Sequence, residues 1–429
     1  MKKYLKVPAI VMGLSVLFCV CFSGCGNTRT IKIDPEEFVV SEEEKADTEA
    51  SEETQISESE EAQDQEASTE NSEGTEMAEE PERELTPAEE IISKMSIEEK
   101  IWQLFVVQPQ QITNKDCVTF VPEGFKDDFM ECPVGGFMFY GNNVDAGPEK
   151  LKDMTSTLID LGYDVEGLPL FMCIDEEGGR VARIGCRDAY NVPHVGPMGE
   201  VFTEDEAYDA GKTIGEYLKE YGFNLDMAPC ADVLTFESNT AIGDRSFGSD
   251  PEFVSKCSAE FSKGLHESGI LSTYKHFPGH GGSFGDTHDG FIFTYKTLEE
   301  MMEDDLVPFA NNEEADCIMV AHISAPAITG DETPASLSYT MITEVLRNKL
   351  GYDGLVMTDA LNMGAIVDFG TQEDVAVMAV LAGVDLIVVP ANVDKAYNGI
   401  YQAVQNGIIT EERLNESLLR IINAKLKVV

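Results

Sequence analysis

Short apolar runs alternate with amphipathic stretches along the chain from Thr86 onward. Mostly continuous apolar runs of this length are typical of strands that are buried on both faces. The runs occupy residues 104–107, 136–140, 169–174, 224–227, 270–274, 317–321, 354–357 and 385–389. Helical spacing of apolar residues follows at 204–221, 251–268 and 340–349. Eight buried strands separated by helices predict an all-parallel α/β sheet, closed as a single (β/α)₈ TIM-like barrel, with an open doubly wound sheet as the alternative.

Polar residues stand where several of these runs end. Asp175 follows the third predicted strand, Lys275 and His276 follow the fifth, His322 follows the sixth and Asp359 follows the seventh. The carboxyl ends of barrel strands meet at one face, and active sites are found there. We therefore expect one pocket to receive these side chains.

The front of the chain has a different pattern. Three lysines within the first six residues precede an apolar run from Val7 to Phe22 and then Ser23-Gly24-Cys25. This order predicts a signal peptide at residues 1–24, and the cysteine after Ser-Gly resembles a bacterial lipobox, which would attach a lipid to Cys25. The alternative is a plain transmembrane anchor, for which the run is short, because a span needs about 20 residues.

An acidic segment follows the predicted signal. From Asp34 to Glu84 there are 22 Asp and Glu against two basic residues, within a chain whose formal net charge is −49. Low hydrophobicity with high like charge predicts a disordered linker over residues 25–85. The rest of the chain is also acidic, which makes nucleic acid a poor partner. Ten cysteines without a CxxC pair indicate neither a zinc ribbon nor a disulfide framework.

The stretch 270–290, ILSTYKHFPGHGGSFGDTHDG, combines a predicted strand with a glycine-rich loop. Asp286 and His288 lie two positions apart, so in extended backbone both side chains point to the same side. An aspartate beside a histidine orients the imidazole and raises its pKa, which suits a proton shuttle. The glycines would let this loop move over a substrate.

Four segments carry a resemblance to a known family. Lys-His-Phe-Pro-Gly-His-Gly at 275–281, followed by Asp286-Thr287-His288, resembles the signature of the β-N-acetylhexosaminidase branch of glycoside hydrolase family 3. The segment 175–183, DEEGGRVAR, resembles the element with which this family holds the sugar. The segment 354–361, GLVMTDAL, matches the family's nucleophile strand, and 242–248, IGDRSFG, also matches.

The resemblance implies a role for each matching residue. Asp359 is expected to be the nucleophile, and His288 the acid/base with Asp286 as its partner. The residues expected to hold the substrate are Asp175, Arg183, Arg245, Lys275 and His276. Glu176, where glutamine is frequent, is expected to make no substrate contact.

Other roles stay open for several of these residues. Asp359 could instead be the N-cap of the following helix. Histidines 276, 280 and 288 could bind a metal, although their spacing lacks a helical metal motif. For Glu177, Arg180 and Asp244, a buried ion-pair network that supports the loops is the better interpretation. Asp226 and Asp232 could be helix or loop caps.

The expected function is that of a retaining exo-β-N-acetylglucosaminidase that uses no cofactor and no metal. Its expected substrates are carbohydrates ending in N-acetylglucosamine, from cell-wall fragments (muropeptides) or chitooligosaccharides. The expected location is extracytoplasmic, at the bacterial membrane through the lipid on Cys25. Two alternatives are a β-N-acetylglucosaminide phosphorylase on the same scaffold and a sugar-binding lipoprotein without catalysis.

Overall fold

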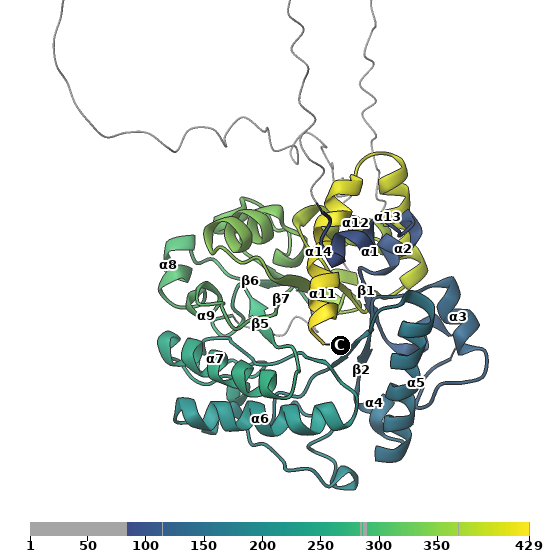
Figure 1. Cartoon of the computed structure of the whole chain (residues 1–429). Coiled ribbons are helices and arrows are strands. Elements are labelled where there is room, and N and C mark those ends of the chain that lie inside the picture. The colour runs from purple at the N-terminus through teal and green to yellow at the C-terminus, as the bar shows by residue number, and fades with distance from the viewer. Residues whose placement is uncertain (1–83, 114, 284, 286–289, 368, 429) are drawn as a thin grey trace, which may run out of the picture. The chain divides into compact units, whose positions relative to one another are not determined.

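The computed structural model describes residues 84–113, 115–283, 285, 290–367 and 369–428 (Figure 1). The chain divides into two units, Met1–Thr86 and Pro87–Val429, and every helix and strand given below belongs to the second. The predicted signal peptide, the lipid site at Cys25 and nearly all of the acidic linker lie outside the described residues and stay predictions. None of the described helices is both long enough and apolar enough to cross a bilayer.

All eight predicted strands are present; six are shorter than predicted, and the other two, β5 and β9, keep the predicted length but are shifted along the chain. They are β1 (Phe105–Val107), β2 (Gly136–Phe139), β3 (Phe171–Ile174), β4 (Leu225–Asp226), β5 (Thr273–Phe277), β7 (Cys317–Val320), β9 (Leu355–Thr358) and β10 (Ile387–Val388). Two further short strands, β6 (Ile292–Phe293) and β8 (Ile323–Ser324), pair with each other outside this set.

The shift of β5 changes the place of two predicted site residues. Lys275 and His276 were expected to follow the fifth strand, but they lie inside β5, whose pairing with β7 continues to Phe277 opposite Val320. The apolar run alone misplaced the strand, because polar side chains can occupy a buried strand when other charged groups in the interior pair with them. Ile270 and Leu271 instead lead into β5, and Leu271 forms a single parallel bridge with Leu225.

The strands form parallel sheets that curl into a half-barrel. Five strands are ordered β10-β1-β2-β3-β4, and three are ordered β5-β7-β9. Single parallel bridges link β4 to the approach to β5, through Leu225 and Leu271, and β9 to the approach to β10, through Met357 and Leu386. In Figure 1 the strands occupy the middle of the unit, and helices such as α5, α6, α7, α12 and α13 surround them.

The described helices cover the outside of this sheet. The longer ones are α5 (Pro148–Glu166), α6 (Glu204–Glu220), α7 (Pro251–Glu267), α12 (Gln372–Ala382), α13 (Val393–Gln405), α14 (Glu411–Lys427) and the π-type helical segment Thr340–Lys349. The shorter ones are α1 (Pro87–Ile92), α2 (Ile97–Trp102), α3 (Phe125–Glu131), α4 (Gly141–Val144), α8 (Leu298–Glu303), α9 (Val307–Ala310), α10 (Pro326–Thr329) and α11 (Gly364–Val367). The three predicted amphipathic helices are confirmed within a residue or two.

Local sequence explains where α6 and α7 begin and how closely they pack. Thr203 caps α6, because its side chain accepts from the Glu206 N–H while the Glu206 carboxylate accepts from the Thr203 N–H. Asp250 caps α7 in a similar way. Gly211 of α6 lies directly against α7, where a Cβ would come within 2.0 Å of the Phe261 carbonyl oxygen. The two helices therefore pack backbone against backbone at this point.

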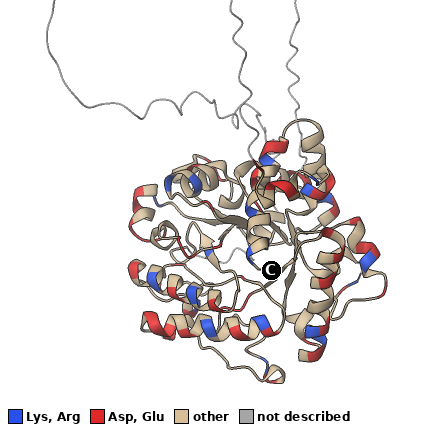
Figure 2. Ribbon diagram, in the orientation of Figure 1, with Lys and Arg blue, Asp and Glu red and all other residues tan. Residues whose placement is uncertain are grey.

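Charge and hydrophobicity separate clearly in this unit. Almost every residue of the strands is buried, and the charged residues in Figure 2 lie mainly on the surrounding helices and loops. Two polar contacts join the last long helix, α14, to the first segments. Lys100 bonds the Glu411 carboxylate at 2.6 Å, and the buried Lys425 ammonium donates to the Gln103 side-chain oxygen at 2.7 Å.

Candidate active site

Lys275 is at the centre of a buried cluster of charges. Its Nζ atom lies 2.8 Å from Asp175 Oδ1 and 2.5 Å from Glu177 Oε1. The side chain is only 2% exposed, so each ion pair is largely removed from water. Burial alone would lower the pKa of Lys275, but the two carboxylates outweigh it and raise that pKa well above its usual range. Lys275 is therefore a permanent cation that fixes two carboxylates.

Two arginines complete this cluster. Arg183 lies 3.2 Å from Asp175 Oδ2, and Arg245 binds both oxygens of Glu177, each at 2.8 Å. Burial raises the pKa of a carboxyl group, but the charges of Lys275 and Arg183 hold the pKa of Asp175 below its usual value. Burial also raises the pKa of Glu177, but the positive charges of Arg245 and, to a smaller extent, Lys275 lower it below its usual value. Both carboxylates are thus ionised and rigidly placed.

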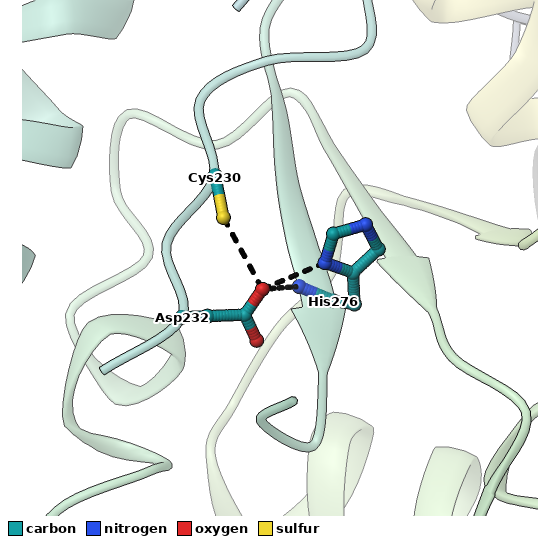
Figure 3. Close-up of side chains that lie close together, drawn as sticks. All are labelled: Cys230, Asp232 and His276. Atoms are coloured by element: carbon teal, nitrogen blue, oxygen red, sulfur yellow. Dashed lines mark hydrogen bonds and ion pairs between the residues drawn. The ribbon is translucent and has the colours of Figure 1, made fainter. Parts of the chain in front are cut away.

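His276 is oriented by a buried aspartate, as Figure 3 shows. Asp232 Oδ2 accepts from His276 Nδ1 at 2.6 Å and from the His276 main-chain N–H at 3.2 Å. On its other side, His276 Nε2 lies 3.2 Å from the Arg245 guanidinium. Since arginine can only donate, Nε2 must accept and Nδ1 must carry the proton. The ring of His276 is therefore held in one orientation, with Nδ1 toward Asp232 and Nε2 toward Arg245.

The three side chains drawn in Figure 3 are of the types that bind metal ions. Cys230, Asp232 and His276 bring one ligand atom each within 4.8 Å of one another. However, the Cys230 thiol and His276 both donate to the same oxygen, Asp232 Oδ2, and burial raises the pKa of the thiol far above its usual value. Histidines 276, 280 and 288 were the alternative metal ligands predicted from the sequence, and the last of them lies outside the described residues. His280 Nδ1 meets the Ser283 hydroxyl at 2.9 Å. The thiol, carboxylate and imidazole groups are thus hydrogen-bonded to one another or to Ser283. Such bonds hold side chains in position.

Asp359 lies at the carboxyl end of β9 and is half-buried. Its Oδ1 accepts from the Ala360 N–H at 2.7 Å, while Oδ2 has no hydrogen bond to any described residue. The next helix, α11, starts only at Gly364, so Asp359 is not its N-cap and that alternative interpretation is wrong. One oxygen is thus fixed by the main chain and the other is available.

His322, which was expected to face the common pocket, is fully buried and bonded within the protein. Its Nδ1 meets Ser336 Oγ at 2.8 Å, and its Nε2 lies 3.1 Å from the carbonyl oxygen of Ala360, the residue after Asp359. The position at a strand end was predicted correctly, but the role is to hold the backbone next to Asp359.

The network predicted for Glu177, Arg180 and Asp244 exists in two parts. Glu177 is buried and ion-paired, as described above. Arg180 and Asp244 form an ion pair of their own at 2.8 Å. Their side chains are 46% and 53% exposed, so the prediction that this pair is buried was wrong. Arg180 also donates to three carbonyl groups of residues 240–242 and so fastens that loop.

Glu176 and Asp232 are supporting residues that the sequence did not reveal. Glu176 is fully buried and accepts the main-chain N–H groups of Arg183, Ile184 and Gly185. It thereby fixes the backbone that carries Arg183. The sequence left Asp232 open as a helix or loop cap, whereas in the structure its carboxylate orients His276. Its only sequence signal is an isolated aspartate after an apolar Met-Ala-Pro-Cys-Ala segment.

The structure brings together Asp175, Arg183, Arg245, Lys275 and His276 by the direct contacts given above. Asp359 ends a strand of the same parallel arrangement. Asp286 and His288 lie outside the described residues, so the predicted acid/base pair stays a prediction. Ionised carboxylates, cations and a histidine can together bind several hydroxyl groups, because they offer both donors and acceptors.

With this site at the carboxyl ends of parallel strands, the comparisons identify the chain as a glycoside hydrolase. It belongs to glycosyl hydrolase family 3, because the family model described as Glycosyl hydrolase family 3 N terminal domain matches residues 96–424. This confirms the resemblance expected from the sequence motifs.

Three relatives illustrate the similarity. Beta-hexosaminidase LpqI of Mycobacterium tuberculosis (strain ATCC 25618 / H37Rv) is 34% identical over 308 residues, 68% of this chain and 76% of that protein. Beta-hexosaminidase A of Pseudoalteromonas piscicida is 31% identical over 341 residues, 73% of this chain but only 57% of that protein. The structure of a glycoside hydrolase family 3 beta-N-acetylglucosaminidase from Paenibacillus sp. str. FPU-7 has a TM-score of 0.72 at 31% identity, covering 78% of this chain and 63% of that one.

Proposed function

We propose that this chain is a retaining, exo-acting β-N-acetylglucosaminidase that removes terminal, non-reducing β-linked N-acetylglucosamine. The observation that carries the proposal is Asp359, half-buried at a strand end, with one oxygen fixed by the Ala360 N–H and the other available. The names of the relatives support the acetamido sugar. Cell-wall fragments such as muropeptides, and chitooligosaccharides, are the proposed substrate classes.

The cluster around Lys275 would hold the terminal sugar. Asp175 is ionised and fixed by two cations, so its oxygens are strong acceptors for sugar hydroxyl groups. Arg183 and Lys275 would donate to the sugar oxygens, and His276 would accept from a sugar hydroxyl group through Nε2. Arg245, which binds Glu177 through Nε and Nη2 and the Ala241 carbonyl group through Nη1, would act mainly by keeping Lys275 and His276 in place.

The proposed reaction has two steps. In the first, Asp359 attacks the anomeric carbon, the bond to the leaving oxygen breaks, and His288 gives its proton to that oxygen. In the second, His288 takes a proton from water, which attacks the anomeric carbon and displaces Asp359. Two inversions give net retention. Asp286 is proposed to orient His288 and to stabilise its charged form.

Architecture and location complete the proposal. We propose that the two groups of strands, with the bridges between them, form one (β/α)₈ barrel. The proposed location is extracytoplasmic, with a lipid on Cys25 as membrane anchor and residues 25–85 as an acidic linker. No cofactor or metal is needed for this chemistry, because carboxylate and imidazole supply both the nucleophile and the proton.

The test compares nitrophenol release from the β-N-acetylglucosaminide and from the β-glucoside, using the full chain and the Asp359→Asn variant. Activity on the first substrate alone, reduced at least about a thousandfold in the variant, is expected. Activity on the glucoside would overturn the acetamido assignment. Equal turnover in the variant would remove Asp359 as nucleophile.

Two further arms separate the alternatives. Product released only in the presence of phosphate would favour the phosphorylase. His288→Ala should slow chitobiose hydrolysis more than nitrophenyl glycoside hydrolysis, because a good leaving group needs little acid assistance. Equal losses on both substrates would remove His288 as the acid.

A further inference from the structure

Tyr140 is placed beside the sugar-holding aspartate by the register of two strands. β2 and β3 are parallel, and their last pair joins Phe139 to Ile174. The next residues on the two strands are Tyr140 and Asp175, so they leave the sheet side by side. Paired residues on neighbouring strands direct their side chains to the same face of the sheet. Since Asp175 points toward Lys275 in the site, Tyr140 faces the same region.

The phenol of Tyr140 is an unused hydrogen-bond donor. The residue is half-buried against the core, and its hydroxyl group has no hydrogen bond to any described residue. Burial raises its pKa, and the nearby carboxylates of Asp175 and Asp359 raise that pKa further. The hydroxyl group thus keeps its proton and lies within the field of the two carboxylates that the proposed mechanism uses. A donor that is half-removed from water and has no protein partner is suited to a ligand.

We infer that Tyr140 is a sugar-positioning residue, whose hydroxyl group bonds an oxygen of the sugar held between Asp175 and Asp359. This inference rests on the proposed function for the identity of the sugar. The placement is specific: Asp175 would hold the hydroxyl groups of the ring, Asp359 would face its anomeric carbon, and Tyr140 would contact the part between them. A pyranose offers both hydroxyl and ring oxygens as acceptors there.

The test uses Tyr140→Phe in the full chain, with Tyr163→Phe as the matched control. Tyr163 lies on α5 and is 41% exposed, so it loses the same hydroxyl group outside the site. Calorimetric affinity for N-acetylglucosamine and the kcat and KM for the nitrophenyl β-N-acetylglucosaminide are measured for each protein. Affinity and kcat/KM should each fall about tenfold in Tyr140→Phe and stay unchanged in the control.

The outcomes separate this inference from the proposed function. A wild-type protein that binds the monosaccharide without hydrolysing the glycoside would overturn the proposed hydrolysis, while a tenfold weaker Tyr140→Phe would still support the positioning role. Affinity within twofold of wild type would overturn the positioning role. A variant whose melting temperature falls in step with its affinity would also overturn it, since the phenol would then serve folding. Absence of both binding and turnover would overturn both.

Discussion

Asp232 is the residue whose replacement tests the site network most directly, and Asp232→Asn is the smallest change. In the wild type, Oδ2 accepts from two N–H groups of His276, and Oδ1 accepts from the His280 N–H at 2.6 Å. The amide of asparagine has one oxygen and one NH₂ group. Whichever way it turns, the NH₂ group faces a buried N–H donor. The variant therefore cannot satisfy this arrangement.

The magnitude follows from the number of donors left unpaired. The less costly orientation keeps the amide oxygen on His276, which leaves the His280 N–H and the new NH₂ group facing each other. Each unsatisfied buried donor costs about 1–3 kcal/mol, so two of them should lower the free energy of unfolding by about 2–6 kcal/mol. Because His276 would lose its fixed position, kcat/KM should also fall, by about tenfold to a hundredfold.

Acid should reduce the difference in stability between the wild type and Asp232→Asn. Burial opposes ionisation of Asp232, but His276 outweighs it and lowers the pKa from 3.8 to about 2. A carboxyl group with a lowered pKa stabilises the folded state above its unfolded pKa, and this contribution is lost as the pH falls through the folded value. The gap between wild type and variant should therefore narrow between pH 3.8 and about 2.

The assay is urea unfolding at pH 7 and at several acidic values, together with nitrophenyl glycoside turnover. Asp164→Asn is the matched control, because Asp164 is 66% exposed and pairs only with the exposed Lys126. It should change the free energy of unfolding by less than about 0.5 kcal/mol. If Asp232→Asn matched this control in both stability and kcat/KM, the positioning role of Asp232 would be refuted.

Two further changes act on stability alone. Burial raises the pKa of Asp305 to about 7 despite its bond with Lys296, so the folded state holds a proton that the unfolded state loses above pH 3.8. Stability should fall as pH rises from about 4 to 7, and Asp305→Asn should flatten that part of the urea-unfolding profile; an unchanged slope would contradict the assignment. Gly211→Ala should cost at least about 2 kcal/mol, because its Cβ would meet the Phe261 carbonyl oxygen at 2.0 Å. Gly196→Ala, whose Cβ would make only an ordinary contact with the Glu200 carboxylate at 3.8 Å, is the control. Equal melting temperatures of the two variants would show that α6 and α7 can separate freely.

The strand pattern could be predicted well because it follows from burial alone. Continuous apolar runs identified all eight strands, since a strand covered on both faces excludes most polar residues. β5 was misplaced for the same reason, because Lys275 and His276 are polar residues inside a buried strand. Periodicity cannot reveal that Asp175, Glu177 and Asp232 compensate them from other strands and loops.

The candidate site could be predicted in its members but not in its internal organisation. The motifs identified the residues that the structure joins around Lys275. They did not separate residues that face a substrate from those that hold others, as Glu176, His322 and Asp232 do. These roles depend on distances between segments far apart in sequence. The tautomer of His276 likewise follows only from its contact with Arg245.

The contacts of α14 bear on the order in which the unit can assemble. Gln103, just before β1, meets its buried partner Lys425 only when the last long helix is in place. The ion pair between Lys100 and Glu411 also joins distant segments, 311 positions apart in the sequence. A growing chain therefore reaches β1 early but cannot satisfy these groups until α14 has been synthesised. Folding of this unit therefore cannot be completed segment by segment, and the partly folded chain stays open to chaperones until α14 has docked.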